Sequence, residues 1–287
     1  MKMLSTLAGA VLFVCAAAPA GAEEKPDDVG YWAGQLQSAA APDVVKALSR
    51  LSNLTYKGAH AAEVKPYVER IAGLLEHADA KVRRGAIEVL LNVQASGHVA
   101  DIAKRLEDAD ADVRKAAIGA LGLFKAADRA DAIAACLDDK NYGIRGAAVD
   151  ALGKLGARDH AGKMVERLQD ENSWVRGLAA SALAKFGKEH AAEIAALLAS
   201  QENDKINALY ALRSLKAGEY VKEAAALLKD EDYAVRLAAL RYLADCAGKE
   251  MAPEIAPLVR DENATVRGEA ESLLKRWKPA PEKAPGK

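Results

Sequence analysis

Arginine side chains recur along this 287-residue chain in one fixed setting, each directly after a valine or an isoleucine. These residues are Arg83, Arg114, Arg145, Arg176, Arg236 and Arg267, with Lys205 in the one interrupted place. A row of guanidinium groups could bind phosphates. However, each cation follows an acidic or amide residue by four positions, and most follow an aspartate by six. We interpret the row as structural, because charge-assisted hydrogen bonds across each turn and between units would occupy the donors.

The histidines are the next residues that could do chemistry. His98, His160 and His190 occupy equivalent places in their units. Equivalent places in a stacked array lie about 10 Å apart, which is too far for one metal ion with ligand bonds near 2 Å. The chain also contains no nucleophile elbow, phosphate-binding loop or spaced cysteine ligands. We therefore predict no catalytic residue, no cofactor and no metal site.

These residues belong to a repeat with a period of 31 residues, as the spacing of Arg83, Arg114 and Arg145 shows. An alanine follows each cation by three positions and a leucine by seven. Within 108–125 the apolar residues fall on one face of a helix, and Asp110 is placed to cap it. The counterparts of this cap are Asp79, Asn141, Asn172, Asp232 and Asn263. A shorter apolar helix precedes each capped helix, so the pattern predicts stacked helix-turn-helix units.

The pattern D-x-x-V-R-x-x-A-x-x-A-L, from Asp110 to Leu121, resembles the HEAT repeat. The repeat length is similar to the short HEAT-like type of phycobilisome lyases. The resemblance covers residues 63–277 and implies an all-α fold, a right-handed α-solenoid of about seven 31-residue helix-turn-helix repeats. Such repeats occur in scaffolds, chaperones and a few enzymes. The His-Glu pairs by which the HEAT-like deoxyhypusine hydroxylase binds iron are absent, since alanine or valine follows every histidine here.

The two ends of the chain depart from the repeat. Residues 1–22 have the form of a secretory signal peptide, with cleavage predicted after Ala22. Cys15 leaves open a lipid-anchored form, although Val14 is a poor residue for a lipobox. Residues 23–62 are expected to hold a linker and an N-terminal capping helix, and the proline-rich tail 278–287 is expected to be disordered. We therefore expect a secreted or periplasmic protein with no membrane insertion after cleavage.

The charge balance limits the kinds of partner. Removing residues 1–22 takes away one cation, which leaves 39 Lys and Arg residues against 41 Asp and Glu residues. A net charge of about −2 argues against nucleic acid, whose binding needs clustered positive charge. The thiols of Cys136 and Cys246 are more than three repeats apart, so we expect buried side chains and no disulfide between them.

A few aromatic residues interrupt the regular pattern and are the best candidates for a partner-binding site. Trp174 lies in a turn where other repeats carry small or polar residues, and Tyr210 stands where others have Gly119 or Ser181. Packing of Trp174 on a neighbouring repeat is an equally good interpretation. Our hypothesis is that Trp174 and Tyr210, flanked by Lys185 and Arg241, bind a protein partner.

The function predicted from these features is that of an exported, non-enzymatic scaffold that binds a polypeptide on the concave face of the solenoid. The alternative is an enzyme or enzyme subunit of the bilin-lyase type, which the resemblance permits. The export signal weighs against this alternative, because such lyases work where pigment proteins are assembled. A tetrapyrrole bound on purification would favour the lyase.

Overall fold

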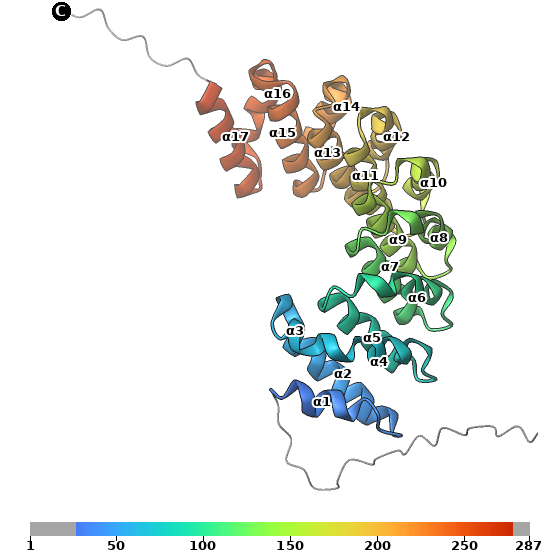
Figure 1. Cartoon of the computed structure of the whole chain (residues 1–287). Helices are drawn as coiled ribbons and strands as arrows, with labels where there is room; N and C mark the ends of the chain where they lie inside the picture. Colours follow the sequence, from blue (N-terminus) through green and yellow to red (C-terminus); the bar gives the residue numbers. More distant parts are fainter. Residues whose placement is uncertain (1–26, 278–287) are drawn as a thin grey trace, which may run out of the picture. The chain divides into compact units, whose positions relative to one another are not determined.

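The computed structural model describes residues 27–277, which form two compact units that divide between Arg105 and Leu106. Every regular element in this range is an α-helix or a 3-10 helix, and none is a strand (Figure 1). The fold is therefore the all-α solenoid of HEAT-like repeats that the sequence predicts. The predicted signal peptide and the proline-rich tail lie outside the described residues.

The first unit begins with a pair of helices where the sequence predicts one capping helix. The indole of Trp32 on the first of these is only 2% exposed, and the second helix packs on α5, so the pair closes the end of the repeats. The α-helices of this unit are α1 (Val29–Gln35), α2 (Ala41–Thr55), α3 (Ala61–Val64), α4 (Val68–Gly73), α5 (Ala80–Asn92) and α6 (Val99–Ala103).

The second unit alternates short and long helices in two rows, and in Figure 1 the long helices line the inner side of the bend within this unit. Each short helix runs on into a 3-10 turn. The α-helices are α7 (Ala111–Leu123), α8 (Ala130–Ala135), α9 (Tyr142–Leu155), α10 (Ala161–Glu166), α11 (Ser173–Phe186), α12 (Ala191–Ala195), α13 (Glu202–Leu215), α14 (Val221–Ala226), α15 (Tyr233–Cys246), α16 (Ala252–Ile255) and α17 (Ala264–Trp277).

The predicted N-caps are confirmed at all six positions. Each cap side chain accepts a hydrogen bond from a backbone N–H of the first helical turn, as Asn141 does from Gly143 at 2.8 Å. The caps are Asp79, Asp110, Asn141, Asn172, Asp232 and Asn263. These bonds satisfy N–H groups that have no partner within the helix, and so they fix where each long helix begins.

Small residues allow the long helices to approach closely. A Cβ atom placed on Gly122 of α7 would lie 3.1 Å from Ala151 of α9, and one on Gly153 would lie 2.9 Å from Ala182 of α11. Glycines of one long helix thus face alanines of the next. Since each interface joins only adjacent repeats, the stability of a repeat depends on its neighbours.

Candidate functional site

The arginine row forms a ladder that joins each repeat to the next. Nε of Arg145 donates to Asp170 Oδ2 at 2.7 Å, and a terminal nitrogen donates to Oδ1 at 2.8 Å. The other terminal nitrogen donates to the carbonyl oxygen of Asp139 at 2.9 Å. Both partners are buried, with 8% of the Arg145 side chain and 2% of the Asp170 side chain exposed. This bidentate geometry leaves the guanidinium no room to bind phosphate.

The same bridge recurs through the second unit, with one cation and one carboxylate at each interface. Its rungs are Arg114–Asp139 (3.0 Å), Arg145–Asp170 (2.7 Å), Arg176–Asp204 (2.9 Å), Lys205–Asp230 (2.8 Å) and Arg236–Asp261 (2.8 Å). The structural interpretation is confirmed with one refinement. Within its own turn each arginine binds backbone carbonyl oxygens, and the carboxylate it binds belongs to the following repeat.

Three carboxylates of the ladder, those of Asp170, Asp230 and Asp261, have lowered pKa values. Burial alone raises the pKa of Asp170, but hydrogen bonds from Arg145 and from the backbone N–H of Asn172 outweigh this effect, so the pKa lies below its usual value. The hydrogen bond from Arg236 is the main cause that lowers the pKa of Asp261. Both carboxylates are therefore charged at neutral pH, as an ion-pair ladder requires.

The histidines lie at the opposite ends of the helices and form bridges of a different kind. His98 Nε2 lies 3.4 Å from Glu69, and His160 Nε2 lies 3.1 Å from Asp131 of the preceding repeat. In both cases the imidazole is mostly covered and the carboxylate is open to solvent. These contacts join successive short helices, so packing between repeats explains the positions of His98 and His160.

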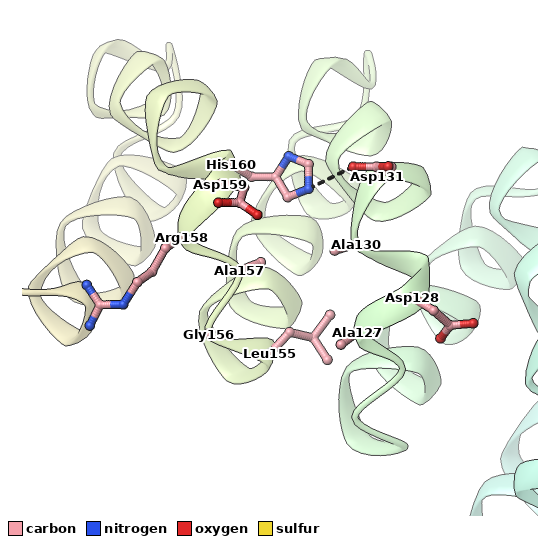
Figure 2. A pocket seen from close by; sticks show the side chains of 10 residues that line it. All are labelled: Ala127, Asp128, Ala130, Asp131, Leu155, Gly156, Ala157, Arg158, Asp159 and His160. Carbon is pink, nitrogen blue, oxygen red and sulfur yellow. Dashed lines mark ion pairs between the residues drawn. The ribbon is translucent and has the colours of Figure 1, made fainter.

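A polar cleft of about 400 Å³ lies beside the pair His160–Asp131. Figure 2 shows it between the stretch from Ala127 to Asp131 and the stretch from Leu155 to His160. Arg158 points away from His160 in this view and pairs with Glu189 at 3.0 Å. The cleft thus holds exposed carboxylates together with the paired imidazole and carboxylate of His160 and Asp131, which form the bridge between repeats described above.

The four residues predicted to bind a partner all lie on the row of long helices. Tyr210 of α13 and Arg241 of α15 occupy the same repeat position on adjacent helices, and Tyr210 is 45% exposed. Trp174 lies at the start of α11 and Lys185 near its end. The structure therefore places Tyr210 and Arg241 at matching positions of neighbouring helices, while Trp174 and Lys185 lie at opposite ends of α11.

For Trp174 the sequence left open two interpretations, packing on a neighbouring repeat and exposure to a partner, and the structure shows both packing and exposure. Its ring makes an edge-to-face contact with Tyr142 of the preceding repeat, with centroids 6.4 Å apart and an interplanar angle of 85°. The ring covers Gly146, where a Cβ atom would lie 2.1 Å from the indole. Nevertheless 47% of Trp174 is exposed. The side chain thus packs on a neighbouring repeat and still presents an aromatic surface to solvent, and a glycine one position after Arg145 was the signal for this packing.

Within the described residues Cys136 and Cys246 are free cysteines; Cys136 is buried, as expected, whereas Cys246 is partly exposed. Burial raises the pKa of the Cys136 thiol to about 11, and burial is also the main cause that raises the pKa of Cys246. At neutral pH both groups are thiols, which are poor nucleophiles. Neither residue is therefore a candidate for covalent catalysis.

Residues 27–277 contain no group of three or more His, Cys, Asp or Glu side chains arranged to hold a metal ion. Within the same range, none of the helices combines the length and the hydropathy that a membrane crossing needs.

Stacked helix pairs tied by an Arg–Asp ladder define an α-solenoid, and comparison with known families agrees. The HEAT-repeat model matches residues 68–151 and 131–216, which together are 149 of the 287 residues. The chain therefore belongs to the HEAT-repeat family. No protein of curated function matches it in sequence.

Two solved structures show the same fold. The chain is similar to an engineered protein at 18% identity and a TM-score of 0.54, over 84% of this chain and 76% of that one. It is also similar to the complex of CpcE and CpcF of phycocyanin lyase from Nostoc sp. PCC7120, at 20% identity and a TM-score of 0.51. That match covers 91% of this chain and 97% of the other. At these identities the likeness extends to the fold alone.

Proposed function

We propose that the protein is an exported, non-enzymatic scaffold that binds a polypeptide on the inner face of its second unit. The observation that carries this proposal is the exposure of Trp174 and Tyr210, 47% and 45%, on a row of helices whose core is already filled. Large aromatic side chains lose little conformational entropy on binding and commonly anchor interfaces. HEAT repeats offer a long surface for such contacts.

The charges of this inner face fit a polypeptide better than a phosphate backbone. Three cations on the face have carboxylate neighbours: Lys154 lies 2.6 Å from Asp150, Arg213 lies 2.5 Å from Asp245, and Arg241 lies 3.6 Å from Glu269. A nucleic-acid groove needs a continuous excess of positive charge. The mixed signs instead suit a partner that carries both charges and apolar side chains.

The experiment is a binding assay with an envelope extract as the source of partners. The mature chain from residue 23 would be cross-linked in the extract, and partners would be identified by mass spectrometry and then purified. Replacing Trp174 and Tyr210 by alanine should weaken binding of the purified partner about thirtyfold or more. Tyr56→Ala is the matched control, because Tyr56 is an exposed aromatic residue (63%) of the first unit. A double variant that binds within about twofold of the parent would exclude this site.

Export is a separate part of the proposal and has its own test. The intact mass of the exported protein should correspond to a chain that begins at Glu23. A diacylglyceryl-modified cysteine at the N-terminus, from Cys15, would instead establish a lipid-anchored protein.

The second candidate function is that of a bilin-lyase subunit, which the likeness to the phycocyanin lyase complex favours. The scaffold is supported by the inner face of the second unit, where Lys154, Arg213 and Arg241 each lie against a carboxylate. Absorbance of the purified protein after incubation with a bilin distinguishes the two. Stoichiometric tetrapyrrole binding would favour the lyase subunit over the scaffold.

A further inference from the structure

The two edges of the second unit differ in charge and in exposed aromatic side chains. We define the turn edge as the turns before the long helices, which are residues 107–112, 138–143, 169–174, 199–204, 229–234 and 260–265. We define the connection edge as the links that follow long helices, which are residues 125–129, 156–160, 187–190, 216–220 and 247–251.

The turn edge carries a large excess of negative charge. It holds 15 Asp and Glu residues and three Lys and Arg residues, and the six cations at the ladder positions from Arg114 to Arg267 still leave an excess of six negative charges. The connection edge holds five Asp and Glu residues and six Lys and Arg residues, so it is nearly neutral. A row of like charges along one edge produces a field that attracts ligands of the opposite sign.

Exposed aromatic side chains lie on the turn edge and not on the connection edge. Tyr142, Trp174 and Tyr233 are 54%, 47% and 49% exposed, and all three occupy the first or second position of a long helix. The one aromatic residue of the connection edge, Tyr220, is only partly exposed. Tyrosine and tryptophan rings attract cations over their faces, so rings and carboxylates on the turn edge favour the same kind of ligand.

The carboxylates next to the rings are open to solvent even where they contact the ladder. The Glu171 side chain is 82% exposed although Oε1 lies 3.1 Å from Arg145, and the Glu262 side chain is 83% exposed although Oε1 lies 3.2 Å from Arg236. Glu171 and Trp174 contact adjacent residues of α9, Arg145 and Gly146. An aromatic ring and a carboxylate thus flank the same helical turn.

We propose that the turn edge of the second unit is a docking surface for an extended polypeptide segment rich in lysine or arginine, anchored at the Tyr142–Trp174 pair. Adjacent helices lie about 8–10 Å apart, and three residues of an extended or polyproline II chain span about the same distance. A segment with a cationic side chain at every third residue therefore places one cation at each repeat. At each repeat the cation is bound by a carboxylate, such as Glu171 or Glu231, or by an aromatic ring.

This surface is separate from Tyr210 and Arg241 of the inner face, so the inference goes beyond the proposed function. Trp174 lies at the corner between the two surfaces. The test below therefore changes Tyr142, Glu171 and Glu231 and leaves the four inner-face residues unchanged. Tyr210→Ala alone removes a contact of the inner face only, so loss of partner binding in that variant leaves this docking surface standing. Loss of peptide binding in Tyr142→Ala likewise leaves the proposed function standing.

The probe is a fluorescent synthetic peptide with lysine at every third residue and glycine between, titrated against the mature chain by fluorescence anisotropy. Glu171→Gln combined with Glu231→Gln should weaken binding about fivefold, and Tyr142→Ala should weaken it about fivefold again. The matched control is Glu189→Gln combined with Glu219→Gln, which removes the same charge from the connection edge and should change the affinity less than about twofold. The turn-edge effect should shrink as salt approaches about 0.15 M and above.

Equal weakening by the two charge variants would overturn the proposal, because the attraction would then come from net charge alone. Failure of the parent protein to bind the peptide at low salt would also overturn it. Sedimentation velocity tests the other occupant: self-association of the parent that Tyr142→Ala abolishes would assign the turn edge to a second copy of this chain and not to a cationic segment.

Discussion

The repeat that contains α9 and the repeat that contains α13 use the same ladder with different parts. Before α9, a turn supplies the capping residue Asn141, and Arg145 makes two bonds to Asp170, one to Glu171 and two to carbonyls of its own turn. The turn before α13 is shorter, and no side chain caps the helix. There Lys205 makes a single side-chain hydrogen bond, to Asp230 at 2.8 Å.

The shorter turn loses the aspartate that the ladder would otherwise use, and Asp204 takes its place from inside the helix. Its carboxylate is 1% exposed and accepts two bonds from Arg176, 28 residues earlier, where the other rungs span 25 residues. The ladder therefore requires a carboxylate between two repeats and does not require one particular turn. What the α13 repeat loses is the side-chain N-cap of its helix and the additional hydrogen bonds of the ladder cation.

The largest effect expected from this comparison concerns the two cations. Arg145→Ala should lower the free energy of unfolding by about 3 kcal/mol, because it leaves the buried carboxylate of Asp170 without its partner. Lys205→Ala should cost about 1 kcal/mol, since Lys205 is 21% exposed and makes one bond. Urea denaturation followed by circular dichroism measures both.

Arg267→Ala is the control for this pair of variants. Within the described residues Arg267 bonds only to carbonyl oxygens of its own turn, so it lacks the bridge to a following repeat. Its loss should cost less than the loss of Arg145. Equal costs for Arg145 and Arg267 would show that the carbonyl bonds, and not the bridge, stabilise the array.

The next effect is a loss of stability in acid. Asp170, Asp230 and Asp261 have lowered pKa values in the folded protein. The unfolded chain then binds more protons than the folded one, so the stability from these groups is complete above about pH 4 and is lost as the pH falls through the folded pKa values. Asp170→Asn should flatten this acid limb in denaturation midpoints recorded from neutral pH downward. An unchanged acid limb would mean that other carboxylates control acid unfolding.

The sequence could predict the ladder because it repeats. The period, the N-caps and the pairing of donors across repeats all follow from residue types at fixed spacing, and each is found in the structure. Asp204 could not be predicted, because it lies directly before Lys205 where no other repeat has an acid, and only the packing of α11 against α13 shows its partner. Gly146 signals a close contact beside Arg145, but that Trp174 makes this contact depends on the distance between the helices.

The smallest effect tests the missing cap of α13. Gln201 already has the extended backbone of an N-cap, with φ −75° and ψ 164°, and its carbonyl accepts the N–H groups of Asp204 and Lys205 at 3.0 Å. Its side chain makes no capping bond. Gln201→Asn should therefore stabilise the protein by about 0.5–1 kcal/mol, as the shorter amide can reach the first-turn N–H groups. Asparagine is preferable to aspartate, because Glu202 and Asp204 would repel a further carboxylate at this position.

The reverse exchange, Asn172→Gln, supplies the matched comparison at α11. It removes the bond to the Trp174 N–H at 3.0 Å and should cost about 1 kcal/mol. Hydrogen exchange of the first turn of α13 should slow in Gln201→Asn, and that of α11 should quicken in Asn172→Gln. If Gln201→Asn leaves both the denaturation midpoint and the local exchange unchanged, the start of α13 is held by the Arg176–Asp204 rung alone. The irregular repeat would then need no cap, because its buried carboxylate already fixes the first turn of the helix.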